Sequence, residues 1–247
     1  MENRARYLLV GVFVLAVLSG GTASVAGFGI GSLLTPLLAV TFGTATAVAA
    51  VAIPHAAATA LRCWRLRANI DWSVLRGFGL LSAAGGLVGA LLYTRFSNDA
   101  LTLTLGLLLL STVLATLVDL PSRVRVTRIV VGVLGLLSGF FGGLAGNQGG
   151  LRAAAMLSLS LSPVRYVATA TATAMLVDIV RTPIYVWRAG GVLTTLVLPL
   201  SVATAGVLIG TVLGERILLG LSIRQFRYAI AVLIGLLGLW LVVQSVN

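Results

Sequence analysis

The stretch IVVGVLGLLSGFFGGLAGNQGGLR (residues 129–152) decides the fold. It begins as an apolar run of the kind that forms a transmembrane helix, which needs about 20 such residues. The run then meets a cluster of small residues between Ser138 and Gly150. Backbone that leaves helical geometry inside a membrane must line a cavity or be buried in protein. We therefore predict a helix, a break and a half-length or re-entrant segment.

A related stretch lies 119 residues earlier in the chain. With this shift Leu18-Ser19-Gly20 aligns with Leu137-Ser138-Gly139, and Gly31 aligns with Gly150. Ten of the 45 positions from 18 to 62 are then identical without a gap. A composition this biased gives roughly a tenth by chance, so the identity gains its weight from the matching lengths of the apolar runs. We predict a duplication, with repeats at 1–120 and 121–247.

The composition indicates that lipid is the solvent. Hydrophobic residues make up 59% of the chain and charged residues 9%, and the mean hydropathy is +1.09. A soluble domain carries roughly a quarter charged residues. We therefore predict an all-α integral membrane protein with about eight transmembrane crossings, as two four-helix repeats that each start with a glycine-broken or re-entrant helix. The apolar runs are Tyr7–Val40, Ala45–Leu61, Val74–Tyr93, Ala100–Val118, Ile129–Leu161, Tyr166–Val186, Leu193–Leu213 and Phe226–Val243.

The charge pattern gives a topology. The net charge of +11 comes from arginine alone, and most arginines flank apolar runs, as the positive-inside rule requires, rather than forming a nucleic-acid surface. We expect a multi-pass protein of the cell (plasma or inner) membrane with both termini cytoplasmic. The arginines assigned to the cytoplasmic side are Arg4, Arg6, Arg62, Arg65, Arg67, Arg76, Arg123, Arg125 and Arg128. The connector with Arg216, Arg224 and Arg227 opposes this topology.

Several classes of chemistry are excluded by the residue inventory. The chain has one cysteine, Cys63, and one histidine, His55, so it offers no His- or Cys-based metal site, no internal disulfide and no Ser/His triad. The glycine clusters lack the preceding strand of a nucleotide-binding loop. We predict no metal, no cofactor and no enzymatic activity, and transport driven by an ion or substrate gradient without ATP.

The second break carries the strongest candidates for substrate binding. Arg152 follows it in an otherwise apolar stretch, and a charge at mid-membrane marks a cavity or a partner. Its guanidinium would fit the oxygens of a small anion. The alternative is an arginine that reaches toward the interface. Asn147 and Gln148 would either bind the anion or satisfy backbone freed by the break, and the N–H groups near Gly149 and Gly150 would point to the same place.

Four further residues are candidates for proton coupling or gating. Asp178 and Arg181 lie three residues apart on one helical face, which predicts an ion pair, and Asp178 could alternatively carry a proton. His55 could relay protons or simply be hydrogen-bonded in the bundle. Arg62 and Arg181 occupy matching positions, which we place at helix ends, where orientation markers are the simpler interpretation.

Paired small-residue motifs make the chain resemble the TauE/SafE family, also called the 4-toluene sulfonate uptake permease family. The resemblance covers nearly the whole chain and implies export of a small sulfur anion such as sulfite, a sulfonate or sulfoacetate. Phe28 and Ile30 interrupt the usual glycine run of the first break, and Asn147-Gln148 enters the second. The motifs are Gly27-Phe-Gly-Ile-Gly31 with Pro36, Arg62-Cys-Trp-Arg65, Asn69-Ile-Asp71-Trp72, Ser138-Gly-Phe-Phe-Gly-Gly-Leu-Ala-Gly146 followed by Asn147-Gln148-Gly149-Gly150, and Ser162-Pro163 before Ala168-Thr169.

The expected partners are therefore a small anionic substrate, the lipid bilayer and, as a coupling ion, protons. We place the anion at the glycines of both breaks, Gly27, Gly29 and Gly31 in the first and Gly149 and Gly150 in the second, together with Arg152, Asn147 and Gln148. Two alternatives stay open: a passive small-anion channel, and a transporter of a non-sulfur carboxylate. We predict no nucleic-acid partner, and nothing in the sequence indicates the oligomeric state.

Overall fold

The computed structural model describes residues 2–26, 29–117, 127–157, 159, 161–217 and 223–246. These residues form helices joined by short turns, and none of them lies in a strand. Gly27, Arg123 and Arg125, for which we made predictions, lie outside the described residues. The α-helices are α1 (Glu2–Ala26), α2 (Ile30–Phe42), α3 (Thr44–Leu66), α4 (Trp72–Val74), α5 (Leu80–Leu92), α6 (Asn98–Leu117), α7 (Arg128–Ala145), α8 (Gly149–Leu157), α9 (Pro163–Leu193), α10 (Val197–Ile217) and α11 (Ile223–Val246).

Helical geometry is interrupted at both predicted places. In the first half α1 ends at Ala26 and the short α2 begins at Ile30. In the second half α7 ends at Ala145, Gly146 takes the left-handed conformation with φ 74°, and the short α8 begins at Gly149. A left-handed glycine after the last helical residue is a common way to end a helix.

The helices have the length and surface of membrane segments. Exposed large side chains are apolar along most helices, including Leu107, Leu136, Ile179 and Val232. The prediction of an all-α membrane protein is thus confirmed, and the number of crossings stays a prediction. Within the described residues four helical stretches are long and apolar enough to cross a membrane, Thr44–Asn69, Trp72–Arg95, Arg128–Ala145 and Pro163–Gly214, and the shorter apolar helices are Leu9–Val25, Ile30–Phe42, Asn98–Leu114 and Ile230–Val246.

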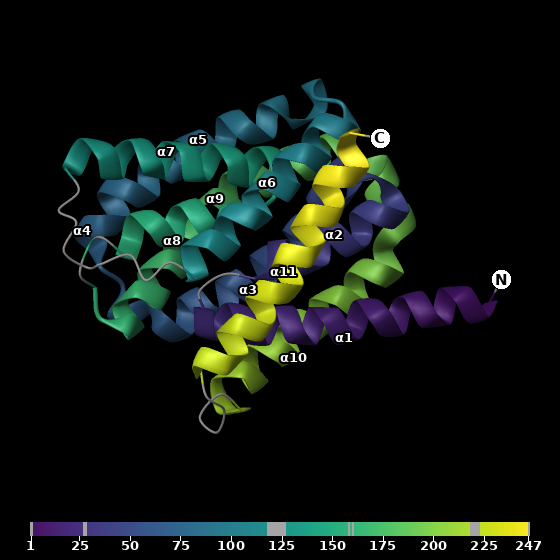
Figure 1. Ribbon diagram of the computed structural model, residues 1–247, viewed down its shortest axis with the longest axis horizontal. Helices are drawn as coiled ribbons and strands as arrows, with labels where there is room; N and C mark the ends of the chain where they lie inside the picture. The colour runs from purple at the N-terminus through teal and green to yellow at the C-terminus, as the bar shows by residue number, and fades with distance from the viewer. Residues whose placement is uncertain are drawn as a thin grey trace.

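The main packing partners come from opposite halves of the chain. Helix α1 packs along α10, α5 along α7, α6 along α11, and α3 along α9 (Figure 1). Small residues let these helices approach closely, as is common between membrane helices. A Cβ atom on Gly139 of α7 would collide with the Ser82 carbonyl of α5, and one on Gly210 of α10 would collide with the Val17 carbonyl of α1.

Two helices differ from the sequence-based prediction. Helix α9 runs from Pro163 to Leu193, straight through Pro183, so Arg181 lies in its middle and the prediction of a helix end there was wrong. A proline can sit inside a long helix when neighbouring helices hold it in place. Between α4 and α5 the chain forms a π-helical turn, η2 (Leu75–Gly79), which the apolar pattern did not reveal. A 3-10 turn, η3 (Tyr93–Arg95), follows α5.

Candidate functional site

The segment between α7 and α8 is fixed by local hydrogen bonds. The Asn147 side-chain oxygen accepts a hydrogen bond from the Gly149 N–H at 3.1 Å, which caps the start of α8. The Ser138 hydroxyl donates to the Gln148 carbonyl at 3.2 Å, across the break. Asn147 therefore satisfies backbone at the break, which was one of its two predicted roles.

The two breaks meet each other in the middle of the protein. A Cβ on Gly31, in the first turn of α2, would come within 2.5 Å of the Gly146 carbonyl oxygen. The Asn147 side-chain N–H₂ group donates to the Ser32 hydroxyl of α2 at 3.3 Å. Gly29, just before α2, has φ 140°, which favours glycine. The starts of α2 and α8 thus approach the same point, and helix starts carry partial positive charge.

Gln148, in the turn between α7 and α8, presents a buried amide. Its side chain is 4% exposed and lies against Gly142, yet neither its amide oxygen nor its amide nitrogen has a hydrogen-bond partner among the described residues. The hydroxyl of Thr35, on α2, is also buried without a hydrogen-bond partner in this part of the chain. Leaving a buried polar group unsatisfied costs about 1–3 kcal/mol, so these groups are suited to receive a hydrogen-bonding ligand.

Arg152 lies in the first turns of α8 and is 4% exposed. It therefore does not reach out of the protein, as the alternative interpretation required. Asp178 and Arg181 of α9 lie within electrostatic range of its guanidinium. Arg152 thus places a full positive charge inside the bundle, on the helix that begins at the second break.

The predicted ion pair between Asp178 and Arg181 is present and extends to a third residue. An Arg181 Nη atom lies 2.8 Å from Asp178 Oδ1, and His55 Nδ1 of α3 lies 2.7 Å from Asp178 Oδ2. The carboxylate is thus held between the two helices that cross at the centre of the protein. Such a buried carboxylate is stable only with partners of this kind.

Arg181 also connects this group to the broken helix. Its Nη1 donates to the Gly142 carbonyl, and the Tyr185 hydroxyl donates to the Gly143 carbonyl. Both carbonyls belong to the last turn of α7, where the last four carbonyl groups of a helix have no partner within the helix. Arg181 and Tyr185 therefore cap the end of α7 immediately before the break.

Arg62 continues the polar chain along α3. It is 2% exposed, and its Nη2 donates to the Thr59 hydroxyl at 3.4 Å. The Thr59 hydroxyl in turn lies 3.3 Å from His55 Nδ1. Arg62 and Arg181 are both buried, and Arg62 lies four residues before the end of α3. Their interpretation as orientation markers stays a prediction. A line of polar side chains runs from Arg62 through Thr59, His55 and Asp178 to Arg181.

The structure thus brings most predicted site residues into one region. Gly31 and Asn147 make contacts between the two breaks, and Gly29, Gln148, Gly149 and Gly150 lie next to them along the chain. His55, Asp178, Arg181 and Arg62 form the polar line. Sequence reasoning missed Ser32, Thr35 and Tyr185, because isolated hydroxyl residues in apolar helices carry no distinguishing pattern. The described residues include no cluster of three His, Cys, Asp or Glu side chains that could hold a metal ion.

Two interrupted helices that meet inside an apolar helical bundle are typical of membrane transport proteins. The chain belongs to the sulfite exporter TauE/SafE family, whose profile matches residues 12–241, nearly the whole sequence. The resemblance seen in the sequence motifs is thereby confirmed. No curated protein and no solved structure matches the chain.

Proposed function

We propose that this protein exports a small sulfur-containing anion, of the sulfite, sulfonate or sulfoacetate type, by a gradient-driven mechanism without ATP. The observation that carries the proposal is the buried amide of Gln148, which lies at the second break against the last turn of α7 and has no hydrogen-bond partner among the described residues. Backbone N–H groups, an amide and a guanidinium are the donors that sulfonate and sulfite oxygens accept from. In this proposal Arg152 supplies the main positive charge, and Gln148 with the starts of α2 and α8 orients the anion.

Protons are the coupling ion in this proposal, carried by His55 and Asp178. The support is geometric: both side chains are buried, 2.7 Å apart, and linked by Arg181 to the end of α7. Adding a proton to this pair removes charge beside Arg181 and weakens its ion pair. If the assignment holds, Asp178→Asn or His55→Ala abolishes pH-driven uptake and spares substrate exchange. Full pH-driven transport by both variants contradicts it.

For the topology we propose eight crossings as two related repeats, with both termini in the cytoplasm. The packing of the helices supports this proposal. The shift of 119 residues that maps α1 onto α7 also maps α5 onto α10. The contact of α1 with α10 therefore corresponds to the contact of α7 with α5. Single cysteines introduced in a Cys63→Ser background would be labelled from either side of the membrane. Labelling of a cysteine at Arg125 only from outside overturns the cytoplasmic assignment.

The decisive experiment measures anion flux in proteoliposomes with Gln148→Leu and, as a matched control, Gln244→Leu. Gln244 lies exposed on α11, so its replacement should leave transport unchanged. Gln148→Leu should weaken the apparent affinity by about tenfold, the loss of one hydrogen bond to a charged ligand. It should not lower stability, because the amide it removes makes no hydrogen bond within the described protein. Unchanged affinity, or loss of folding instead, contradicts the role of Gln148.

The same assay separates the alternatives. A carrier saturates with substrate, whereas a passive anion channel conducts without saturation. Competition by acetate as strong as that by an alkyl sulfonate would indicate a carboxylate transporter. Saturable flux, competed by the sulfonate alone, supports the proposal.

A further inference from the structure

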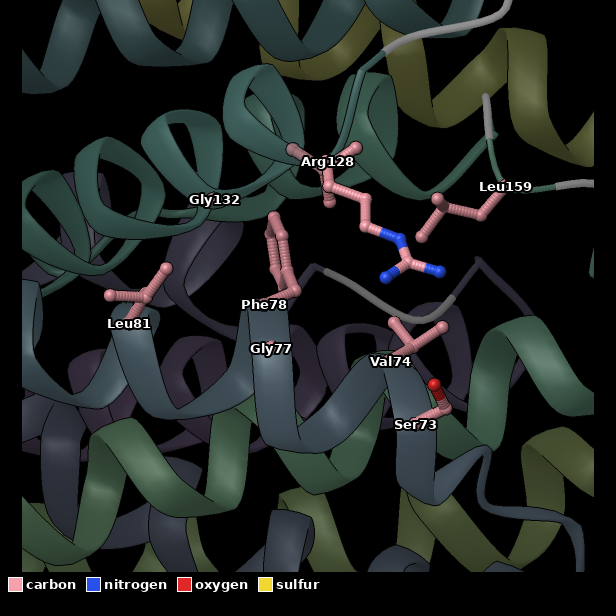
Figure 2. Close-up of a pocket in the computed structure, with 9 residues that line it drawn as sticks. Ser73, Val74, Gly77, Phe78, Leu81, Arg128, Gly132 and Leu159 are labelled. Atoms are coloured by element: carbon pink, nitrogen blue, oxygen red, sulfur yellow. The ribbon is translucent and has the colours of Figure 1, made fainter.

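A pocket outside the break crossing is lined, among the described residues, by the charged Arg128 and by mostly apolar side chains. It has a volume of about 410 Å³ and lies between η2 with α4 on one side and the start of α7 on the other. Figure 2 shows the Arg128 side chain extending from α7 into this space, with Phe78, Val74 and Leu159 around its guanidinium. Within the described residues no ion pair or hydrogen bond of Arg128 is present. Pockets of this size hold small organic ligands.

Phe78 connects the wall of the pocket to the helix that carries Arg152. It is 1% exposed, lines the pocket and packs in one cluster with Ala155 and Met156 of α8. Met156 lies four residues after Arg152 on the same helix, so the two side chains share a face. Phe78 therefore contacts both the pocket and α8. The aromatic ring stands on the π-helical turn, an irregularity that is frequent at functional sites.

We infer that this pocket is a second anion site, at which Arg128 holds a small organic anion before or after the anion occupies the inner site at Arg152 and Gln148. The inference rests on the proposed function and extends it. Its chemistry also selects the ligand: one guanidinium fits one anionic group, while Phe78, Val74, Leu81, Val131 and Leu159 offer only apolar contact. The pocket thus favours an anion with a hydrocarbon group, such as an alkyl or aryl sulfonate, over a bare oxyanion.

The test uses the full-length protein with a reporter cysteine in the pocket. Ser73→Cys in a Cys63→Ser background places a thiol on the wall that faces Arg128. Gly77→Cys serves as a second reporter, because a side chain there meets no atom within 4 Å. The rate of modification by N-ethylmaleimide is followed with benzenesulfonate, with sulfate as the bare oxyanion, and with uncharged benzenesulfonamide.

Benzenesulfonate should slow the modification of both reporters, sulfate should do so only at higher concentration, and the sulfonamide should have no effect. Adding Arg128→Gln should raise the half-protecting concentration of benzenesulfonate about tenfold, as expected for a lost hydrogen bond to a charged group. Arg95→Gln, at the far end of α5, is the matched control for loss of one exposed arginine and should change nothing. Equal protection with and without Arg128 overturns the inference, as does absence of protection.

Lipid headgroups and the inner anion site are each tested by a separate measurement. For lipid headgroups, the reporter cysteines are compared in phosphatidylglycerol and phosphatidylcholine nanodiscs. If they become unreactive only in phosphatidylglycerol, and benzenesulfonate has no effect, the pocket is a lipid headgroup site and the inference is overturned. Protection that persists in Arg152→Gln shows that the pocket binds independently of the inner site. If benzenesulfonate does not protect the reporter cysteines but sulfonate flux is normal, only the second anion site is refuted. If it protects them but the protein transports no anion, only the proposed function is refuted.

Discussion

At both breaks a long helix is followed by a short one, but the side chains at the two breaks differ in chemistry. In the first, Gly29 and Gly31 bring α2 to the crossing, and the position that matches Arg152 is the buried Leu33. In the second, Asn147 and Gln148 fill the turn and Arg152 follows it. The first break therefore provides close backbone approach, and the second provides side-chain donors and charge.

The same asymmetry appears in the helices behind the breaks. Arg181 of α9 pairs with the carboxylate of Asp178, whereas its counterpart Arg62 of α3 donates to Thr59, which matches Asp178 in sequence. Charge and hydrogen-bonding groups at these matched positions thus collect in the second half of the chain. A single small anion needs only one set of donors, so the site has no reason to be symmetric.

The largest difference between the halves should appear in the free energy of unfolding, when Asp178 and its matched residue Thr59 are each substituted in a separate variant. Asp178→Asn leaves Arg181 buried without its carboxylate, and breaking a buried ion pair costs about 3–5 kcal/mol of unfolding free energy. Thr59→Val removes the hydroxyl that accepts a hydrogen bond from the Arg62 guanidinium, and it should cost less, about 1.5–3 kcal/mol. Reversible unfolding in mixed detergent micelles measures both. Equal losses of unfolding free energy in the two variants would mean that Asp178 and Thr59 contribute equally to stability, which contradicts the expected difference.

The next effect concerns anion affinity. Arg152→Gln should weaken binding about 10- to 100-fold, because it removes a charge and its hydrogen bonds. Arg152→Lys keeps the charge but loses the planar fork, so its loss should be smaller. Leu33→Met, at the matched position, should leave affinity unchanged. Titration calorimetry on folded protein gives all three values, and undiminished affinity in Arg152→Gln would remove that residue from the site.

A third comparison contrasts the two glycines with positive φ at the breaks. Gly29→Ala should cost about 1–3 kcal/mol, because φ 140° is strained for any side chain. The new Cβ would also lie 2.9 Å from Thr22 Cγ2. Gly146→Ala should cost about 1–2 kcal/mol, since its left-handed φ is tolerated better and its nearest neighbour is at 3.5 Å. Thermal unfolding ranks the two, and the reverse order would show that the second break is the tighter one.

The smallest effect concerns the cap of α7. Tyr185→Phe removes the hydroxyl that donates to the Gly143 carbonyl and should cost about 1 kcal/mol. Tyr93 stacks edge-on against Tyr185 at 4.8 Å, and no hydrogen bond of its hydroxyl is present among the described residues. Tyr93→Phe is therefore the control and should cost less. With the shift of 119 residues, Leu66 of the first half matches Tyr185, and a leucine side chain cannot donate such a hydrogen bond.

The features that depend on residues close together in the sequence could be predicted. The apolar runs and small-residue clusters gave both helix breaks, and the spacing of Asp178 and Arg181 gave their ion pair. His55 and Asp178 are 123 residues apart, so only the crossing of α3 and α9 reveals their contact. The meeting of Ser32 with Asn147 is hidden for the same reason. The burial of Arg62 and the length of α9 depend on neighbouring helices, which no short window of sequence contains.

The reciprocal packing of the halves has a consequence for how the chain folds during synthesis. Helix α1 ends at Ala26, but its main partner α10 begins only at Val197. At a synthesis rate of about 5–20 residues per second, α1 remains in the bilayer for roughly 10–30 seconds before that partner exists. During this time the glycine face of α1 is open to lipid or to other helices. The nascent protein is therefore most exposed to mispairing early, and its final core closes only when the last helices have been inserted.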